Sequence, residues 1–148
     1  MKENEIRTVA QKMGIKENNK TIFINSPENI INILNAPKLK IENNLKSGCF
    51  DYIHFFAKSQ NELNEIFKNL KDNLDISGML WVSWPKNKQL NTDLTLPIVI
   101  KIGYSFGLVE STCLSINEVW SALKFTHPKK NKIYKNSHAE LKSRTTNR

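Results

Sequence analysis

The most informative pattern in the chain is an uncharged, largely apolar run over residues 76–85 that contains two tryptophans. Trp81 and Trp84 stand among aliphatic residues, and a proline ends the run. A short stretch without a polar face is typical of a strand that is buried on both faces of a sheet. We therefore expect residues 77–86 to form an interior strand with parallel neighbours. That strand places Trp84 and Lys86 at the carboxyl edge, where open α/β sheets bind their ligands.

Four further segments show the three- and four-residue spacing of apolar positions that is typical of an amphipathic helix. The clearest begins after Ser59, which together with Glu62 fits a capping box. Ser26 and Pro27 fit the cap and the first position of another helix. The predicted helices are residues 5–13, 27–34, 60–74 and 96–106.

Strands are predicted where β-branched and aromatic residues occur in short runs bounded by turn residues. Besides residues 77–86, these runs are residues 20–24, 38–42, 50–56, 109–116 and 119–126. If the second and third strands lie on either side of the first, residues 43–49 must cross it. The crossing spans about 20 Å, which seven extended residues can reach but which leaves no room for a helix.

The last two strands are predicted to form a hairpin around Asn117 and Glu118. An alternative stays open, because Ser115 and Glu118 also fit a capping box for a short helix over residues 116–123. We favour the hairpin because Trp120 and Phe125 stand among residues that prefer strands.

The order of these elements predicts an α/β fold with three layers. It is a mostly parallel, Rossmann-like sheet with helices on both faces and an antiparallel C-terminal hairpin. A chain of 148 residues suffices for one core. We expect a single domain over residues 1–127 and a flexible basic tail over residues 128–148.

The net charge of +8 is concentrated at the C-terminal end of the chain. Residues 124–148 carry eight Lys or Arg against one acid, whereas residues 1–123 carry fourteen against thirteen. Such a tail either keeps the protein in solution or contacts nucleic acid weakly through phosphates, with strong salt dependence. The lysines that would make this contact are Lys129, Lys130, Lys132 and Lys135.

Other features of the sequence concern the compartment and the metal chemistry. The longest uncharged run is too short to span a bilayer, and residues 1–5 lack the features of a signal peptide. We therefore expect a cytoplasmic protein without a membrane partner. Cys49 and Cys113 lack metal-ligand spacing and are expected to be reduced and buried. No motif of a metal site, a phosphate loop or a serine hydrolase occurs.

The tryptophan segment also carries a resemblance. Residues 78–86 read Gly-Met-Leu-Trp-Val-Ser-Trp-Pro-Lys, and residues 92–95 and 120–124 support the same match. The chain resembles, over about residues 8–127, a family of small bacterial proteins with a Gly-x-Leu-Trp-Val-(Ser/Ala)-Trp-Pro-Lys signature and no assigned activity. The layout is similar to a shortened class I methyltransferase, which implies a fold but no reaction.

A class I methyltransferase holds S-adenosylmethionine with a glycine-rich turn after the first strand and an acid near the end of the second. Here the turn after the first strand is Asn25-Ser26-Pro27, and no glycine stands between Gly14 and Gly48. Glu42 is the acid at the second strand. We therefore expect no cofactor, S-adenosylmethionine included.

An aromatic ring, a cation and an acid at the carboxyl edge can hold a planar anionic ligand. The candidate ligand residues are Asn25, Ser26, Glu42, Trp84, Lys86 and Asp93. The competing interpretation is structural: the tryptophans fill the core, Asp93 binds nearby loop amides, and Glu42 is solvated. No catalytic residue is assigned, because His54 is expected to be a hydrogen-bonded core residue.

Three functional hypotheses follow from these residues. The first is a non-catalytic, methyltransferase-like binding or regulatory module. The second is a small-molecule enzyme, a degenerate S-adenosylmethionine-dependent methyltransferase working at the edge that carries Trp84. The third is a nucleic-acid accessory protein that acts through its basic tail.

Overall fold

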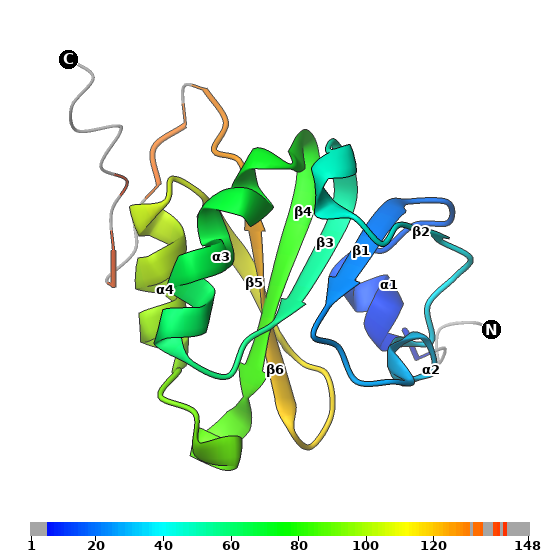
Figure 1. Cartoon of the computed structure of the whole chain (residues 1–148), viewed down its shortest axis with the longest axis horizontal. Helices are drawn as coiled ribbons and strands as arrows, with labels where there is room; N and C mark the ends of the chain where they lie inside the picture. Colours follow the sequence, from blue (N-terminus) through cyan, green and yellow to red (C-terminus); the bar gives the residue numbers. More distant parts are fainter. Residues whose placement is uncertain (1–5, 131, 135–137, 140, 142–148) are drawn as a thin grey trace.

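The centre of the fold is a six-stranded sheet in the order β2-β1-β3-β4-β6-β5 (Figure 1). The computed structural model describes residues 6–130, 132–134, 138, 139 and 141. Strands β2, β1, β3 and β4 run parallel, and β6 runs antiparallel to both of its neighbours. The strands are β1 (Lys20–Ile24), β2 (Lys40–Ile41), β3 (Phe50–Phe56), β4 (Leu74–Pro85), β5 (Val109–Ser115) and β6 (Trp120–Thr126). The predicted fold class is confirmed.

The helices divide between the two faces of the sheet. Helices α3 (Gln60–Asp72) and α4 (Leu96–Ser105) cover one face and share a core with Trp84. The short helices α1 (Val9–Met13) and α2 (Ile30–Leu34) cover the other face and share a second core with Trp81. The two tryptophans of β4 therefore fill the cores on opposite faces of the sheet.

Strand β4 lies in the interior of the sheet, between β3 and β6. Trp81 is fully buried and Trp84 is 4% exposed. The predicted interior position is confirmed, but the prediction of parallel neighbours on both sides is wrong. Helix α4 returns the chain, so β5 runs parallel to β4. Strand β6, the hairpin partner of β5, lies between β4 and β5 and runs antiparallel to both.

The start of β4 differs from the prediction. The strand begins at Leu74, directly after α3, three residues before the predicted start at residue 77. Leu74 pairs with Phe50 and Met79 with Tyr52, so five steps along β4 match two steps along β3. Gly78 stands in this bulge, where a Cβ atom would lie 2.5 Å from the Phe50 carbonyl oxygen. The bulge needs a residue without a side chain at this point.

The beginnings of α1 and α2 were predicted incorrectly. α1 starts after Thr8, whose hydroxyl accepts a hydrogen bond from Gln11 N, so residues 6–8 of the predicted helix are not helical, and Glu5 lies outside the described residues. The predicted cap at Ser26 and Pro27 is also wrong, since α2 starts only after Asn29 and has no side-chain cap. Because Asn25 takes a left-handed conformation with φ 58°, the chain turns too sharply there to enter a helix directly.

The capping box of α3 is only half formed. Ser59 Oγ accepts a hydrogen bond from Glu62 N at 3.1 Å, as predicted. The Glu62 carboxylate accepts from Lys58 N at 2.7 Å, one residue before the position that the motif requires. Thr95 is the N-cap residue of α4 and Pro97 lies in its first turn, so this helix begins at residue 96, as predicted.

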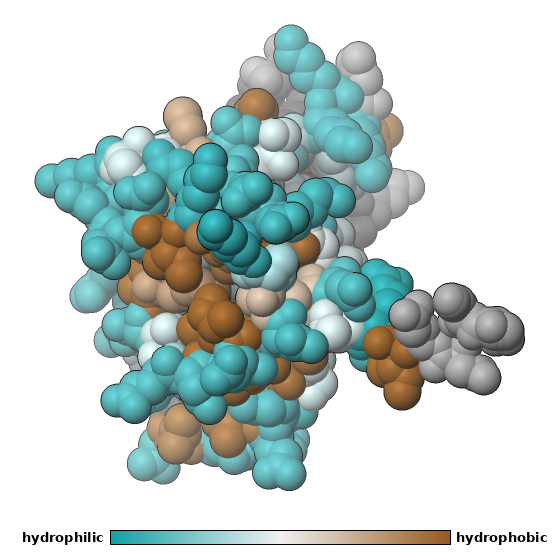
Figure 2. All heavy atoms as spheres, turned by 90° about the vertical axis from the view of Figure 1, so that its right-hand side faces the viewer, coloured by the Kyte–Doolittle hydropathy of each residue, from teal (hydrophilic) through white to brown (hydrophobic). Residues whose placement is uncertain are grey.

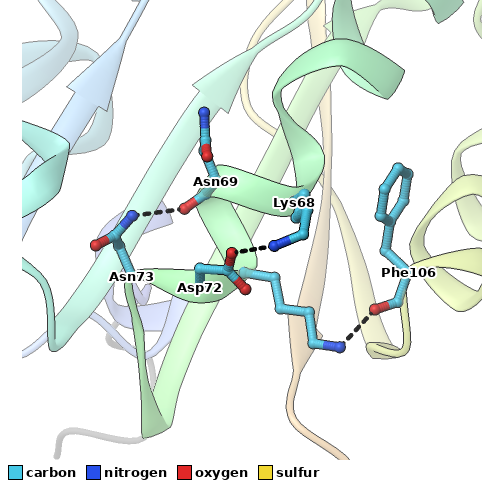
Figure 3. Close-up of polar contacts among 6 residues, drawn as sticks. Lys68, Asn69, Asp72, Asn73 and Phe106 are labelled. Carbon is cyan, nitrogen blue, oxygen red and sulfur yellow. Dashed lines mark hydrogen bonds and ion pairs between the residues drawn. The ribbon is translucent and has the colours of Figure 1, made fainter.

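The C-terminal end of α3 is tied to α4 by polar contacts (Figure 3). Lys71 Nζ donates to the Phe106 carbonyl oxygen at 2.7 Å, and Asn73 Nδ2 donates to the Asn69 carbonyl oxygen at 2.8 Å. Lys68 and Asp72 form an exposed ion pair on the same turn, with Nζ and Oδ2 2.7 Å apart. The two hydrogen bonds satisfy carbonyl groups at two helix ends, and the bond from Lys71 to Phe106 joins α3 to the end of α4.

The hairpin of β5 and β6 is confirmed, and the alternative helix over residues 116–123 is wrong. The side-chain oxygen of Asn117 accepts hydrogen bonds from Val119 N and Trp120 N, both at 2.9 Å. These bonds close the turn between the strands, which is the usual role of an Asn side chain in a tight turn.

The β2 side of the sheet is abbreviated, as the short crossing predicts. β2 pairs only with Lys20 and Thr21 of β1, and residues 43–49 hold just one 3-10 turn, η2 (Leu45–Ser47). Figure 2 views this side and shows apolar side chains gathered within a hydrophilic surround. Ile41 is half exposed, and Ile24 and Leu39 are partly buried. The two-residue strand is too short to cover the apolar edge of β1.

The chain beyond β6 returns to the domain in its described part. Leu141 is 3% exposed within the core under α3 and α4, and Tyr134 and Ala139 pack partly against the same core. Lys135 lies outside the described residues. In the part of the chain that the structure describes, no helix is long and apolar enough to cross a membrane.

The close approach of α4 to β6 predicts the effect of a substitution at Gly103. A Cβ atom there would collide with the Phe125 ring. We expect Gly103→Ala to lower the free energy of unfolding by about 1–2 kcal/mol, because an overpacking cost of about 1–3 kcal/mol outweighs the better helix propensity of alanine. Urea denaturation measures this change.

The matched control is Lys101→Ala, an exposed position on the same helix, which should change the stability by less than about 0.5 kcal/mol. Adding Phe125→Leu to Gly103→Ala should return part of the lost stability if the ring is the obstacle. Equal stability of Gly103→Ala and the wild type would contradict the described packing.

Candidate functional site

The carboxyl edge of the sheet holds a hollow beside the end of β4. It has a volume of about 440 Å³ and lies between the end of β4, the start of α4 and the hairpin. Its lining includes two predicted residues, Trp84 and Lys86, and also Lys88, Cys113 and Ser121. The last three were not predicted, because the sequence did not reveal that β6 lies directly against β4, with Ser121 opposite Trp84.

Trp84 and Lys86 are largely occupied by the protein itself. The Trp84 ring lies in the core under α3 and α4 and offers little surface to a ligand. Lys86 Nζ donates a hydrogen bond to Ser115 Oγ, and Lys86 N donates to the Val119 carbonyl oxygen at 2.7 Å. Lys88 is exposed and is the more accessible cation of this hollow.

The loop that follows β4 has an unusual backbone. In the 3-10 segment η3 (Lys86–Asn91), four residues have positive φ angles between 51° and 60°, namely Asn87, Lys88, Leu90 and Asn91. Asparagine tolerates the left-handed conformation, but for lysine and leucine it costs about 1 kcal/mol or more each. Such strain is common at functional sites, and here it lies at the edge where α/β sheets bind ligands.

Asp93 serves a structural contact instead of lining this hollow. Its carboxylate accepts a hydrogen bond from Gln60 N at 2.8 Å, and its carbonyl oxygen accepts from Gln60 Nε2 at 3.0 Å. The acid therefore ties the loop before α4 to the first turn of α3, where a negative charge is favourable. The amide that Asp93 binds belongs to the first turn of α3 and not to the loop of Asp93 itself.

Asn25, Ser26 and Glu42 lie on the other side of β3 from this hollow and are not part of its lining. Glu42 N donates to the Thr21 carbonyl oxygen at 2.8 Å, which sets Glu42 level with the middle of β1. By strand spacing, Asn25 stands about 10 Å further along the strand direction. The structure therefore does not bring the six predicted ligand residues together in one site.

His54 lies in the core, as predicted, within a buried polar chain. Its Nδ1 is 2.7 Å from the Tyr52 hydroxyl, its Nε2 is 2.7 Å from Ser83 Oγ, and its ring stacks on Phe56. Burial lowers the pKa of His54 to about 3 and raises the pKa of Tyr52. A neutral imidazole satisfies both neighbours, since it has one donor and one acceptor nitrogen.

The partner of His54 has a signal in the sequence. Ser83 is the one hydroxyl between the two tryptophans of a strand that is otherwise apolar there. A polar side chain buried in a sheet must find a hydrogen-bond partner on a neighbouring strand. Pairing Ser83 with the only histidine of the predicted strands would have found this contact.

Both cysteines are free, as expected, but the prediction that they are buried is wrong. Cys49 precedes β3 in a left-handed turn with φ 52°, and Cys113 lies on the edge strand β5. Each cysteine stands in or beside an apolar stretch of the sequence but is exposed to solvent in the fold. Among the described residues, no group of three or more His, Cys, Asp and Glu side chains could hold a metal ion.

Three of the predicted basic residues lie at the opposite edge of the sheet. Lys129, Lys130 and Lys132 line a hollow of about 890 Å³ near the amino end of β4. Lys129 N donates to the Tyr134 hydroxyl at 2.9 Å, and Lys132 Nζ lies 5.1 Å from the centroid of the Tyr134 ring. The described lysines therefore belong to a folded segment.

We compared the chain with known protein families, curated proteins and solved structures. No protein-family model and no curated protein sequence matches the chain. Among solved structures, it is similar to a ribosomal protein L11 methylase from Lactobacillus delbrueckii subsp. bulgaricus, with a TM-score of 0.55 and 10% identity over 80% of this chain and 74% of that one. The chain has a methyltransferase-like fold.

Two further structures support the same conclusion. A TehB-like SAM-dependent methyltransferase from Corynebacterium glutamicum matches with a TM-score of 0.53 and 10% identity, over 85% of this chain and 90% of that one. A magnesium protoporphyrin IX methyltransferase from Synechocystis PCC 6803 matches with a TM-score of 0.51 and 11% identity, over 80% and 78%. At such low identity, the likeness shows the fold alone.

The buried histidine predicts a specific dependence of stability on pH. The pKa of His54 is lowered in the folded state, so the unfolded chain binds its proton more readily. The stability that neutral His54 contributes is fully present above the ordinary histidine pKa of about 6.5. It is lost as the pH falls toward the pKa of His54 in the folded state. We expect His54 to contribute a slope of up to about 1.4 kcal/mol per pH unit in this window.

Urea denaturation between about pH 7.5 and pH 4.5 measures this slope. His54→Gln should be less stable at neutral pH and should show a shallower decline with acid than the wild type. His127→Gln, at the end of β6, is the matched control and should keep the wild-type slope. Parallel pH profiles of the wild type and His54→Gln would contradict a buried neutral histidine.

Proposed function

We propose that the protein is a methyltransferase-fold binding or regulatory module that does not transfer a methyl group from S-adenosylmethionine. The observation that carries the proposal is the turn after β1. We also propose that it acts in the cytoplasm and belongs with the small bacterial proteins that share the tryptophan signature. Two free, exposed thiols agree with a reducing compartment.

The residues of the β1 turn do not fit the cofactor in the usual way. A glycine-rich turn lets the backbone approach the cofactor and leads straight into a helix. Here Asn25, Ser26 and Pro27 each carry a side chain, and Pro27 has no N–H to donate. Helix α2 begins only at Ile30 and has five residues, so its first amides stand away from the turn.

The acid expected to bind ribose hydroxyls does not fit either. Glu42 follows the two-residue strand β2 and is level with Ile22, two residues before the end of β1. It therefore lies about 7 Å short of the carboxyl edge. A fold that keeps the sheet but lacks both elements of the cofactor site supports a binding role.

The binding part of the proposal concerns the hollow beside the end of β4. Lys88 provides an accessible cation, and the first turn of α4 begins at Thr95 without a side-chain hydrogen bond to its amides. The N–H groups of Leu96 and Ile98 at this helix start, where Pro97 has none, together with a nearby lysine favour a small anionic ligand. The strained loop over η3 supports the same location.

Titration calorimetry with S-adenosylmethionine tests the proposal. We expect no saturable heat up to about 1 mM, because the β1 turn cannot receive the cofactor. The TehB-like SAM-dependent methyltransferase from Corynebacterium glutamicum serves as the positive control. Circular dichroism of the same sample shows that the protein under test is folded. Micromolar binding, followed by methyl transfer to any acceptor, would overturn the proposal.

A second candidate function is a small-molecule methyltransferase that holds the cofactor away from the β1 turn. The hollow lined by Lys86, Lys88, Cys113 and Ser121 favours it. If this candidate is correct, S-adenosylmethionine binds, and Lys86→Ala with Lys88→Ala weakens that binding at least tenfold. Lys38→Ala, an exposed lysine outside this lining, is the matched control and should leave the affinity unchanged.

Asp93→Ala separates structural from ligand effects in the same titrations. Because the Asp93 carboxylate accepts from Gln60 N, we expect this variant to lose about 1 kcal/mol of stability, as in the loss of a helix cap. Its affinity for any ligand of the hollow should stay unchanged once the protein is folded. A selective loss of affinity at full stability would show that Asp93 contacts the ligand.

A further inference from the structure

The larger hollow of about 890 Å³ lies at the edge of the sheet opposite the usual methyltransferase ligand edge. Its walls are the bulge of β4 at residues 76–78, the start of β5, the end of β6 and the segment that follows β6. We infer that this hollow binds the phosphate group and base of a nucleotide, either free or within a single-stranded nucleic acid.

The charge of the lining selects an anionic ligand. Lys124 lies on the sheet side of the hollow, and Lys129, Lys130 and Lys132 lie on the other side. The acid in this lining is Glu110, whose carboxylate accepts a hydrogen bond from the Tyr104 hydroxyl at 2.8 Å. Among the described lining residues, four lysines and one carboxylate give a net positive charge, which attracts phosphate.

Lys124 is the lysine of this lining that stands on the sheet itself. It stands in β6, opposite Trp81 of β4, and is partly buried. Its ammonium group lies near the position that a Gly14 Cβ atom would take, and no ion pair within the described ranges involves it. A partly buried cation without a carboxylate is stabilised by an incoming anion.

The segment after β6 is held in shape by Tyr134. The hydroxyl of Tyr134 accepts from Lys129 N at 2.9 Å, and Lys132 Nζ lies over its ring. These two contacts bring Lys129 and Lys132 to the side chain of Tyr134. The lysines of this segment are thereby kept beside the sheet, where they face the same volume as Lys124.

Apolar groups in the lining select a ligand with a planar apolar part. Ile76 projects from the bulge of β4 and is 77% exposed, and Val109 and Pro128 line the same volume. A simple inorganic anion would leave the Ile76 and Pro128 side chains in contact with water. A nucleotide provides phosphate for the lysines and a base that packs on Ile76 and Pro128.

Fluorescence anisotropy with a labelled single-stranded oligonucleotide, and calorimetry with ATP, test this inference on the full chain. Both are run at about 50 mM and about 200 mM salt. We expect micromolar binding that weakens with salt. Lys124→Glu with Lys130→Glu should lower the affinity at least tenfold and reduce the slope of the salt dependence by about two.

Lys38→Glu and Lys16→Glu together are the control for net charge and should change the affinity by less than twofold. Lys130→Glu alone changes a fully exposed residue and keeps the test valid if the Lys124 variant is unstable. Ile76→Ser should weaken the binding of the base without changing the salt slope. ATP binding assigns the site to free nucleotides, and oligonucleotide binding without ATP binding assigns it to nucleic acid.

Two results would overturn the inference. One is the absence of binding of either probe below about 1 mM, and the other is an equal loss of affinity in the control with matched charge. These outcomes are independent of the proposed function, because the titration with S-adenosylmethionine concerns the opposite edge of the sheet.

Discussion

The fold depends on the burial of β4 on both faces of the sheet. Trp81 fills the layer under α1 and α2, and Trp84 fills the layer under α3 and α4. Replacing a buried aromatic residue by alanine costs about 3–5 kcal/mol, against a total stability of about 5–15 kcal/mol for a typical domain. The strand therefore joins two cores that would otherwise be small. The positions of both hollows follow from it, since one lies at its carboxyl end and the other at the bulge near its start.

The two edges of the sheet have different chemistry. At the carboxyl edge, where open α/β sheets bind their ligands, the β1 turn carries side chains and no glycine. At the opposite edge, the bulge of β4 and the segment after β6 bring lysines and apolar groups together. Because a fold does not determine a function, the roles of both edges have to be argued from these side chains.

The parts of the fold that follow from local patterns were predictable. The spacing of Leu63, Phe67 and Leu70 determines α3, and the aromatic run determines β3 over the residues expected. The start of β4 was missed because Leu74 continues the apolar stripe of the predicted helix and Asp75 interrupts the apolar pattern of the strand. The antiparallel direction of β6 against β4 was also missed, because it depends on which edge the hairpin joins and not on any local sequence signal.

The candidate site was less predictable than the fold for the same reason. Asp93 and Gln60 are far apart in the sequence, and only the packing of α3 beside the loop before α4 shows that they bind each other. Lys88 and Ser121 became part of one hollow through the pairing of β4 with β6. The sequence predicts that Glu42 follows the second strand. Its position along β1 depends on the register between β1 and β2, which the sequence does not specify.

Hydrogen exchange followed by NMR tests the central position of β4 most directly. The account predicts that the amides of Leu80 to Ser83 exchange only through global unfolding, so that their protection equals the free energy of unfolding from urea denaturation. Amides of β2 and α2, at the abbreviated side of the sheet, should exchange several orders of magnitude faster. Exchange of the β4 amides at rates like those of β2 would contradict the account.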